Sequence, residues 1–156
     1  MQNLVREINR ILIKKKKTVA VAESCTGGML SEAFSRLKGS SVYFLLGVVA
    51  YSKETKQKIL KIPSRVILKE GLVSKKTTEM MASSVRKLTG ADFGVGITGF
   101  AGPGGGTKDN PVGSVFISIK TKNRMISKKY IFQGSRQEIK KKAVLKTLRI
   151  LKGLLL

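Results

Sequence analysis

Apolar residues recur every three or four positions in four segments, which is the spacing that places them on one face of a helix. These segments span residues 3–13, 29–37, 75–88 and 139–151. In the third segment the residues predicted to face inward are Met80, Met81, Val85 and Leu88. A shorter helix is predicted over residues 53–60, before Pro63. The sequence thus predicts four amphipathic helices and one short helix.

Between these helices lie short runs of β-branched and apolar residues that predict strands. Two of them, residues 18–24 and 42–51, predict buried strands, and residues 93–99 predict a strand that runs into a loop. Two more, residues 115–120 and 127–132, predict an antiparallel hairpin. This alternation over 156 residues predicts one α/β domain, residues 1–156, folded as a three-layer α/β/α sandwich with a mixed, mostly parallel sheet.

Basic residues strongly outnumber acidic ones, with 31 Lys and Arg against 9 Asp and Glu and a net charge of +22. Such an excess favours anionic partners. The basic residues are spread along the chain, aromatic residues make up only 6% of it, and tryptophan is absent, so platforms for base stacking are few. The charge therefore indicates mostly a solvated surface with a bias toward anions, and nucleic acid is not expected as a partner.

The single cysteine, Cys25, has no second cysteine with which to form an internal disulfide. The first residues alternate apolar with charged side chains, unlike the apolar stretch of a signal peptide. The longest nearly apolar run, residues 42–51, is about half as long as a membrane-spanning helix. These features predict a cytoplasmic protein with no membrane partner. An edge strand and an apolar surface leave a homodimer open.

The chain contains no histidine, which excludes serine–histidine and cysteine–histidine catalysis within one chain. The commonest zinc ligand is also missing and the nine carboxylates are scattered, which argues against a structural zinc site. A Mg²⁺ ion held by one or two carboxylates stays open, but no metal requirement is predicted. We expect no cofactor. Any serine chemistry must then use a lysine or a carboxylate as base, and a lysine serves only when its pKa is lowered from about 10.4.

The motif AESCTGG, residues 22–28, lies where the first predicted strand turns into the next helix. Ser24 falls at the carboxyl end of that strand, and the helix begins with the amides of Thr26, Gly27 and Gly28. Unpaired amides at a helix N-terminus can bind a phosphate or a developing oxyanion. The same residues are also typical of a plain helix N-cap, so both interpretations stay open at this point.

The motif AYSKETK, residues 50–56, follows the second predicted strand. It places Tyr51 and Ser52 at the strand end, and Lys53 and Lys56 near the first turn of the short helix. A lysine near a helix N-terminus is electrostatically disfavoured, which predicts a lowered pKa. For any one lysine, a solvated cationic face is the alternative interpretation.

A glycine-rich loop, GITGFAGPGGGTKDNPVG at residues 96–113, includes the end of the third predicted strand. It has neither the P-loop spacing nor the dinucleotide-binding fingerprint. Long loops of this kind often form ligand sites or lids, and a plain connector is the alternative.

Together, AESCTGG, GVVAYSKETK, GLVS at residues 71–74 and the glycine-rich loop closely resemble the C-terminal domain of the CinA family, the nicotinamide mononucleotide amidohydrolases. The resemblance covers about residues 3–152, with the motifs in family order and at family spacing. It implies hydrolysis of the carboxamide of nicotinamide mononucleotide to nicotinate mononucleotide and ammonia, a step of pyridine nucleotide salvage. It also implies a serine/lysine mechanism.

The resemblance further implies a set of site residues. Ser24 is expected to be the nucleophile and Lys56 the general base, and the other polar positions of the site are Tyr51, Thr98 and Arg136. The amides expected to stabilise the oxyanion are those of Thr26, Gly27 and Gly28. The groups expected to bind the substrate phosphate are Arg136 and the loop residues Gly104, Gly105, Gly106 and Thr107. Cys25 is expected to be a packed small hydrophobe that points away from the site, because neighbouring side chains of a strand face opposite sides.

Two other functions stay open. A homologue that binds the ligand without turnover would carry the same motifs, since a small displacement of Lys56 is enough to prevent catalysis. A nucleic-acid-associated protein is the other, suggested by the net charge of +22 and by the family's link with competence and DNA damage.

Overall fold

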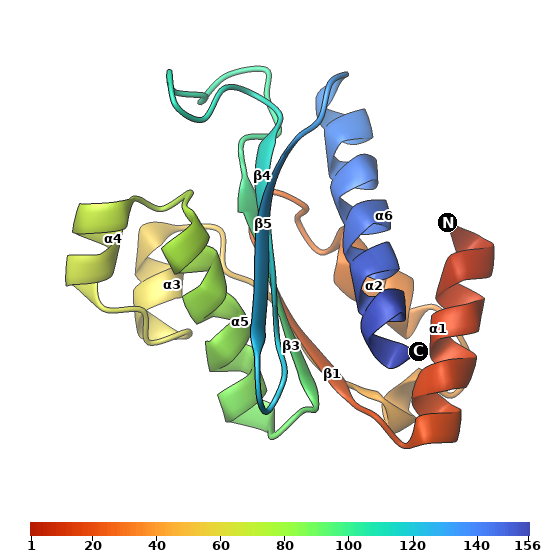
Figure 1. The fold of residues 1–156 in the computed structure, drawn as a ribbon. Helices are drawn as coiled ribbons and strands as arrows, with labels where there is room; N and C mark the ends of the chain where they lie inside the picture. Colours follow the sequence, from red (N-terminus) through yellow and green to blue (C-terminus); the bar gives the residue numbers. More distant parts are fainter.

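The computed structural model describes residues 1–156, which form a five-stranded sheet covered by helices on both faces (Figure 1). The strands are β1 (Val19–Glu23), β2 (Phe44–Val49), β3 (Phe93–Gly99), β4 (Ser114–Lys120) and β5 (Met125–Ile131). The helices are α1 (Gln2–Lys15), α2 (Met29–Ser35), α3 (Lys53–Lys58), α4 (Ser64–Glu70), α5 (Lys75–Thr89) and α6 (Arg136–Leu155), with a short 3-10 helix, η1, at Ser40–Val42. Helices α1, α2 and α6 lie on one side of the sheet and α3, α4 and α5 on the other (Figure 1), which confirms the predicted three-layer sandwich.

The strands follow the order β2-β1-β3-β4-β5 in the sheet. Strand β1 pairs in parallel with both β2 and β3, whereas the pairs β3–β4 and β4–β5 are antiparallel. Only β4 therefore runs against the direction of the other strands, and the prediction of a mixed, mostly parallel sheet is confirmed. The predicted hairpin of β4 and β5 is also present, closed by hydrogen bonds between Thr121 and Arg124.

Strand β2 differs from its prediction as a fully buried strand. It lies at the edge of the sheet, and the side chains of Leu45 and Val49 are 44% and 43% exposed. Hydrophobicity along the chain cannot distinguish an edge strand from a central one, because long-range pairing decides the strand order. The homodimer stays a prediction, and this apolar edge is compatible with it.

Two features of the α3–α5 side also differ from the sequence pattern. Helix α4 begins directly after Pro63 and is too short for its periodicity to stand out. In α5, Met81 and Val85 are buried as predicted and Met80 is half-buried, but Leu88 is 57% exposed. Leu88 lies in the last turn of the helix and lines a surface cavity together with Leu60 and Met80.

The sheet separates two apolar clusters because alternate residues of each strand face opposite sides. In β1, Val19 and Val21 belong to the cluster under α1, α2 and α6, whereas Ala20 and Ala22 belong to the cluster under α5. Helix α5 lies unusually close to β3. A Cβ atom on Gly96 would overlap the carbonyl oxygen of Thr78, so glycine is required at this contact.

The carboxyl ends of the parallel strands β1, β2 and β3 meet at one end of the sheet. Helices α5 and α6 both begin at that end, and the loop between β3 and β4 rises above it (Figure 1). No helix is both long and apolar enough to cross a membrane. The fold thus brings strand ends, helix N-termini and the glycine-rich loop together at one place.

Candidate active site

A cavity of about 220 Å³ lies at the carboxyl end of the parallel strands. Five segments contribute to its lining: Ser24 and Cys25 after β1, Tyr51 after β2, Leu72 and Val73 before α5, the residues that follow β3, and Arg136 at the start of α6. Each of the four main sequence motifs therefore reaches this cavity, although some of their residues lie elsewhere.

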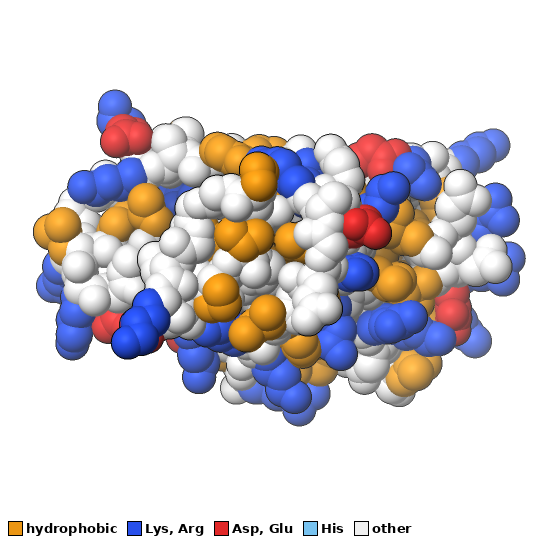
Figure 2. Space-filling view, turned by 90° about the horizontal axis from the view of Figure 1, so that it is seen from above, with side chains coloured by type: hydrophobic (Ala, Val, Ile, Leu, Met, Phe, Trp, Pro, Cys, Tyr) orange, Lys and Arg blue, Asp and Glu red, His pale blue; other side chains and the backbone are white.

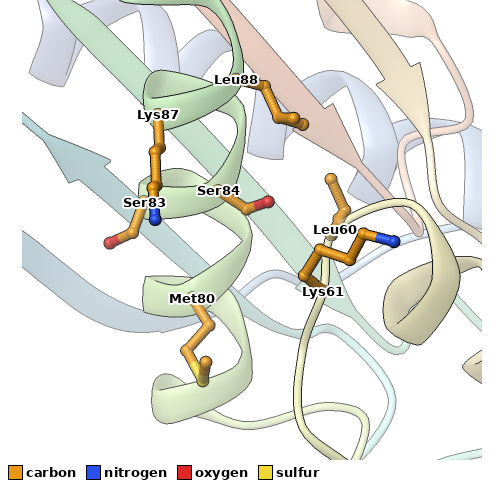
Figure 3. Close-up of a pocket in the computed structure, with 7 residues that line it drawn as sticks. All are labelled: Leu60, Lys61, Met80, Ser83, Ser84, Lys87 and Leu88. Carbon is orange, nitrogen blue, oxygen red and sulfur yellow. The ribbon is translucent and has the colours of Figure 1, made fainter.

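The largest cavity, about 570 Å³, is a different one (Figure 3). It lies between α5 and the segment after α3, and its hydroxyl groups belong to Ser83 and Ser84. Figure 3 shows its lysines, Lys61 and Lys87, directed away from the Ser84 hydroxyl. It contains no paired nucleophile and base, so size alone does not identify the chemical site.

A serine and a lysine lie within hydrogen-bonding distance at the smaller cavity. The Nζ atom of Lys56 lies 3.1 Å from the Oγ atom of Ser24. It also lies 2.6 Å from the carbonyl oxygen of Ala50 and 3.4 Å from that of Tyr51. The Lys56 side chain is only 2% exposed, so these groups are almost its whole polar environment.

Local structure explains why Lys56 reaches Ser24. Strands β1 and β2 are neighbours, and the amide of Ala50 donates to the carbonyl of Glu23 at 2.8 Å. A capping box between Ser52 and Thr55 then starts α3 immediately after the strand. Lys56 lies about one helical turn after the start of α3, and its side chain reaches the end of the sheet at Ser24.

All three neighbours accept hydrogen bonds from the Lys56 ammonium, and the same three positions also serve a neutral amine. Such an amine has two N–H donors and one lone pair. The carbonyls of Ala50 and Tyr51 can accept the two N–H bonds, which leaves the lone pair directed to the Ser24 hydroxyl. In that state Ser24 donates and Lys56 accepts, which is the arrangement required before proton transfer.

Burial lowers the pKa of Lys56 from 10.5 to about 8. A lowered pKa is as predicted, but the predicted contribution of a helix N-terminus is wrong. Lys56 lies in the last turn of the short helix α3, where the helix dipole does not disfavour a cation. Loss of solvent around the ammonium is the dominant cause instead.

Cys25 is a buried neighbour of the nucleophile, with only 6% of its surface exposed. Burial raises the pKa of its thiol to about 12, so it is not a thiolate at neutral pH. The prediction of a packed small hydrophobe is therefore confirmed. The prediction that Cys25 points away from the site is wrong, because Cys25 lines the same cavity as Ser24. The strand ends at Glu23, and the alternation of strand side chains does not extend into the turn that follows.

The turn after Ser24 provides fewer free amides than the sequence analysis expected. The amide of Gly27 donates to the carbonyl of Ser24 at 3.0 Å, so it closes the turn and does not face a ligand. The amides of Cys25, Thr26 and Gly28 donate to no acceptor in the chain. Gly28 has a φ of 92°, which favours glycine. Thr26 is fully buried and its hydroxyl has no partner.

Glu23 is a structural residue that the sequence analysis did not identify. Its carboxylate is fully buried and accepts hydrogen bonds from the amides of Leu30 (3.0 Å) and Ser31 (2.8 Å) and from the Ser31 hydroxyl (2.6 Å). It thereby occupies the first amides of α2. The available signal was a glutamate before the turn and a glycine, with no capping side chain, at the N-cap position. An anion at this site must therefore bind the turn amides and not the helix N-terminus.

Thr98 lies beside Ser24 in the neighbouring strand. Glu23 pairs with Ile97, and the amide of Ser24 donates to the carbonyl of Ile97 at 3.0 Å. Ile97 faces the α6 side of the sheet, so Thr98 faces the opposite side, from which Lys56 approaches. Thr98 is fully buried and its hydroxyl has no hydrogen-bond partner.

Tyr51 and Arg136 join two segments that are far apart in the sequence. The Arg136 guanidinium donates to the Tyr51 hydroxyl and to the carbonyl of Gly102, both at 2.8 Å. The Tyr51 side chain is 58% exposed, and only its backbone carbonyl contacts Lys56. These bonds hold the guanidinium at the edge of the cavity.

The glycine-rich loop contributes less to the cavity than predicted. Gly104 lines it, but Gly105, Gly106 and Thr107 do not. Thr107 instead closes a local turn with Asn110. Its hydroxyl accepts from the Asn110 amide at 3.0 Å, and its amide donates to the Asn110 carbonyl at 2.9 Å. The prediction that these three residues bind the substrate phosphate is therefore not supported by the cavity.

The surroundings of the cavity are cationic. Lys140, another residue that the sequence analysis missed, has its Nζ atom 3.4 Å from the position that a Cβ on Gly27 would occupy. The acidic side chains nearby, Glu23 and Glu138, are engaged in caps of α2 and α6. Figure 2, which looks onto this end of the molecule, shows apolar side chains surrounded by Lys and Arg with few carboxylates. No group of three or more Cys, Asp or Glu side chains is placed to hold a metal ion.

The fold and the site define a three-layer α/β/α domain with a buried serine–lysine pair at the carboxyl end of its parallel strands. The chain matches the CinA C-terminal domain over residues 1–155, and it belongs to that family. It is 44% identical over 143 residues to a CinA-like protein of Endomicrobium trichonymphae. The matched region is 92% of this chain and 33% of that protein. The chain thus spans about a third of the length of the curated relatives it matches.

Solved structures of chains about as long as this one also match. A competence or damage-inducible protein from Enterobacter asburiae has a TM-score of 0.95 and 30% identity, covering 99% of this chain and 98% of that one. A competence/damage inducible protein from Agrobacterium tumefaciens has a TM-score of 0.94 and 32% identity, covering 98% and 94%. These names describe a biological link and no chemical reaction.

Proposed function

We propose that this chain is an amidohydrolase that converts the carboxamide of nicotinamide mononucleotide to a carboxylate and releases ammonia. The single observation that carries this proposal is the buried pair of Lys56 Nζ and Ser24 Oγ, 3.1 Å apart at the edge of a cavity. The chain has no histidine that could serve as base instead.

The first step is attack on the carboxamide carbon. Neutral Lys56 takes the proton of the Ser24 hydroxyl as Oγ forms its bond to carbon. The carbonyl oxygen of the substrate becomes an oxyanion. The free amides of Cys25 and Thr26 are the nearest donors in the sequence to stabilise it.

The tetrahedral intermediate then collapses. Protonated Lys56 returns its proton to the leaving nitrogen, the C–N bond breaks, and ammonia leaves an ester on Ser24. Lys56, neutral again, takes a proton from water as the water oxygen attacks the ester. As the second intermediate collapses, protonated Lys56 gives that proton to Ser24 Oγ, which restores the hydroxyl, and nicotinate mononucleotide leaves with its carboxyl proton lost to solvent.

The remaining polar residues support binding. Arg136 places a fixed positive charge at the cavity edge, where the anionic end of the substrate would extend. The buried Thr98 hydroxyl, on the same side of the sheet as Lys56, is available to the serine–lysine pair. The small apolar walls formed by Leu72, Val73 and Phe100 suit a flat pyridine ring.

The test is ammonia release from nicotinamide mononucleotide. Wild type is expected to release it, and Ser24→Ala and Lys56→Met are each expected to lower kcat by at least about 10²-fold. Cys25→Ala is the matched control for the nucleophile and is expected to keep turnover. Absence of release by wild type, or full activity in Lys56→Met, would overturn the proposal.

If the chain binds the ligand without turnover, wild type would release no ammonia. A nucleic-acid-associated role is addressed separately, since the net charge of +22 favours polyanions. If many phosphates are contacted, affinity for duplex DNA falls steeply with salt. Weak binding with a shallow salt dependence would exclude that role.

A further inference from the structure

A polar cavity of about 480 Å³ lies at the end of the sheet opposite the serine–lysine pair. The first residue of β3, Phe93, lines this cavity, and its last residue, Gly99, lines the one at Ser24. At about 3.3 Å per residue, the length of the strand separates the two cavities by about 20 Å. The end of α5 and the turn between β4 and β5 lie at this end of the sheet, away from the glycine-rich loop (Figure 1). The reaction proposed at Ser24 therefore does not account for this cavity.

The lining of the cavity is strongly basic. Four cationic side chains and one carboxylate contribute to it: Lys17, Arg86, Lys122, Arg124 and Asp92. The carboxylate of Asp92 is already engaged, because it accepts from Lys17 Nζ at 2.7 Å and from the amide and hydroxyl of Thr18 at 2.9 and 3.1 Å. The other three cations form no ion pair in the chain. The cavity thus has a surplus of positive charge that no carboxylate of its lining balances.

Arg86 is the most firmly placed of these cations. It is half-buried in the last turn of α5, and its Nε atom donates to the carbonyl of Asp92 at 3.3 Å. Its two Nη groups have no acceptor in the chain. A Cβ on Gly94 would lie 2.5 Å from the Cβ of Arg86, so glycine is what lets this turn of α5 pack on β3. A fixed guanidinium with free donors favours an acceptor such as a phosphate, which it can bind through two hydrogen bonds.

The turn between β4 and β5 supplies the remaining cations from a rigid backbone. The amide of Thr121 donates to the carbonyl of Arg124 at 2.9 Å, and the amide of Arg124 donates to the Thr121 hydroxyl at 3.1 Å. That hydroxyl donates in turn to the Arg124 carbonyl at 3.2 Å. The side chains of Lys122 and Arg124 make no hydrogen bond within the chain. An anion in the cavity would therefore meet free cations from both α5 and the hairpin.

We infer that this cavity is a binding site for a small anion that carries several phosphoryl groups, separate from the active site. Three unpaired cations match the charge of an oligophosphate better than that of a single phosphate. The two apolar residues of the lining are Phe93 and Leu154, and Phe93 is only 7% exposed, so an apolar body would gain little here. The same burial of Phe93 leaves no ring on which a nucleic-acid base could stack.

The experiment measures binding of inorganic triphosphate to the full chain by calorimetry, at about 0.15 M salt to screen distant charges. Wild type is expected to bind one equivalent. Arg86→Gln and Arg124→Gln are each expected to raise Kd roughly 10- to 100-fold, the effect of losing a charge-assisted hydrogen bond. The Arg124 side chain has no hydrogen bond or ion pair to lose, so this second variant tests the site without disturbing the fold.

Two controls separate this site from general charge and from the active site. Arg65→Gln removes the same charge from an exposed position of α4 and is expected to bind triphosphate as wild type does. Arg136→Gln alters the cavity at Ser24 and is also expected to keep this binding. Ammonia release is not the readout, so failure of the proposed function leaves the result unaffected.

Four results would overturn the inference. The first is no binding of triphosphate by wild type, and the second is an equal loss of affinity in Arg65→Gln. The third is binding that is lost in Arg136→Gln and kept in Arg86→Gln, which would place the anion at Ser24. The fourth is a short DNA duplex that binds more tightly than triphosphate and depends equally on Arg86 and Arg124, which would assign the site to a polynucleotide.

Discussion

Burial of Lys56 predicts a specific dependence of activity on pH. Only the neutral amine can take the proton of Ser24, and burial lowers the pKa of Lys56 from 10.5 to about 8. At pH 7 about one tenth of the protein then carries a neutral amine, against about one in 3,000 for an unperturbed lysine. Burial therefore raises the active fraction about 300-fold at neutral pH.

The expected profile follows from these fractions. The value of kcat/KM reports the free enzyme, so it should rise about tenfold per pH unit up to about pH 7.5 and become constant above about pH 9. Between pH 6.5 and 9 the total increase is about 30-fold. An unperturbed lysine would give about 300-fold over the same range, with no plateau.

The assay is ammonia release from nicotinamide mononucleotide at constant ionic strength. Few other groups interfere, because the chain has no histidine and the pKa of Cys25 is raised to about 12. The second ionisation of a phosphate monoester lies near pH 6, so measurements begin above it. Lys56→Arg is the control, since its guanidinium stays charged and should abolish the pH-dependent rise.

Two results would refute the reasoning. A flat profile from pH 6.5 to 9 would mean that no amine titrates in the rate-determining chemistry. A tenfold rise per unit that continues beyond pH 10 would mean that burial does not lower the pKa of Lys56.

Three further predictions concern stability, measured by urea unfolding. Between about pH 8 and 10.5, Lys56 is neutral in the folded state and charged in the unfolded state. The free energy of unfolding of wild type should therefore increase by about 1.4 kcal/mol per pH unit relative to that of Lys56→Met in this range. A constant difference between the two proteins would contradict this. Glu23→Ala leaves the Leu30 amide and the Ser31 donors without an acceptor and should cost about 2–4 kcal/mol, and a loss under about 0.5 kcal/mol would show that water replaces the cap. Gly96→Ala should cost at least about 2 kcal/mol through overlap with α5, whereas Gly104→Ala, with open space around it, should change stability little; equal effects would contradict the close contact.

The sequence by itself determined the local structure and the candidate chemistry. Strand β3 follows its predicted range, residues 93–99, because its short apolar run is bounded by turn residues on both sides. The absence of histidine restricted the base to lysine or a carboxylate, and the motifs directed attention to Ser24 and Lys56. Such inferences succeed because helix periodicity, strand composition and side-chain chemistry are properties of neighbouring residues.

Only the tertiary structure decided which groups meet and how they are solvated. Ser24 and Lys56 are 32 residues apart, and Tyr51 and Arg136 are 85 apart, so only the packing of strands and helices together brings each pair into contact. The lowered pKa of Lys56 comes from burial, which no local pattern records. Likewise, the Gly27 amide is consumed by its own turn, and Lys140 reaches that turn from a distant helix. These outcomes depend on long-range packing, in which a few ångströms separate a free donor from an engaged one.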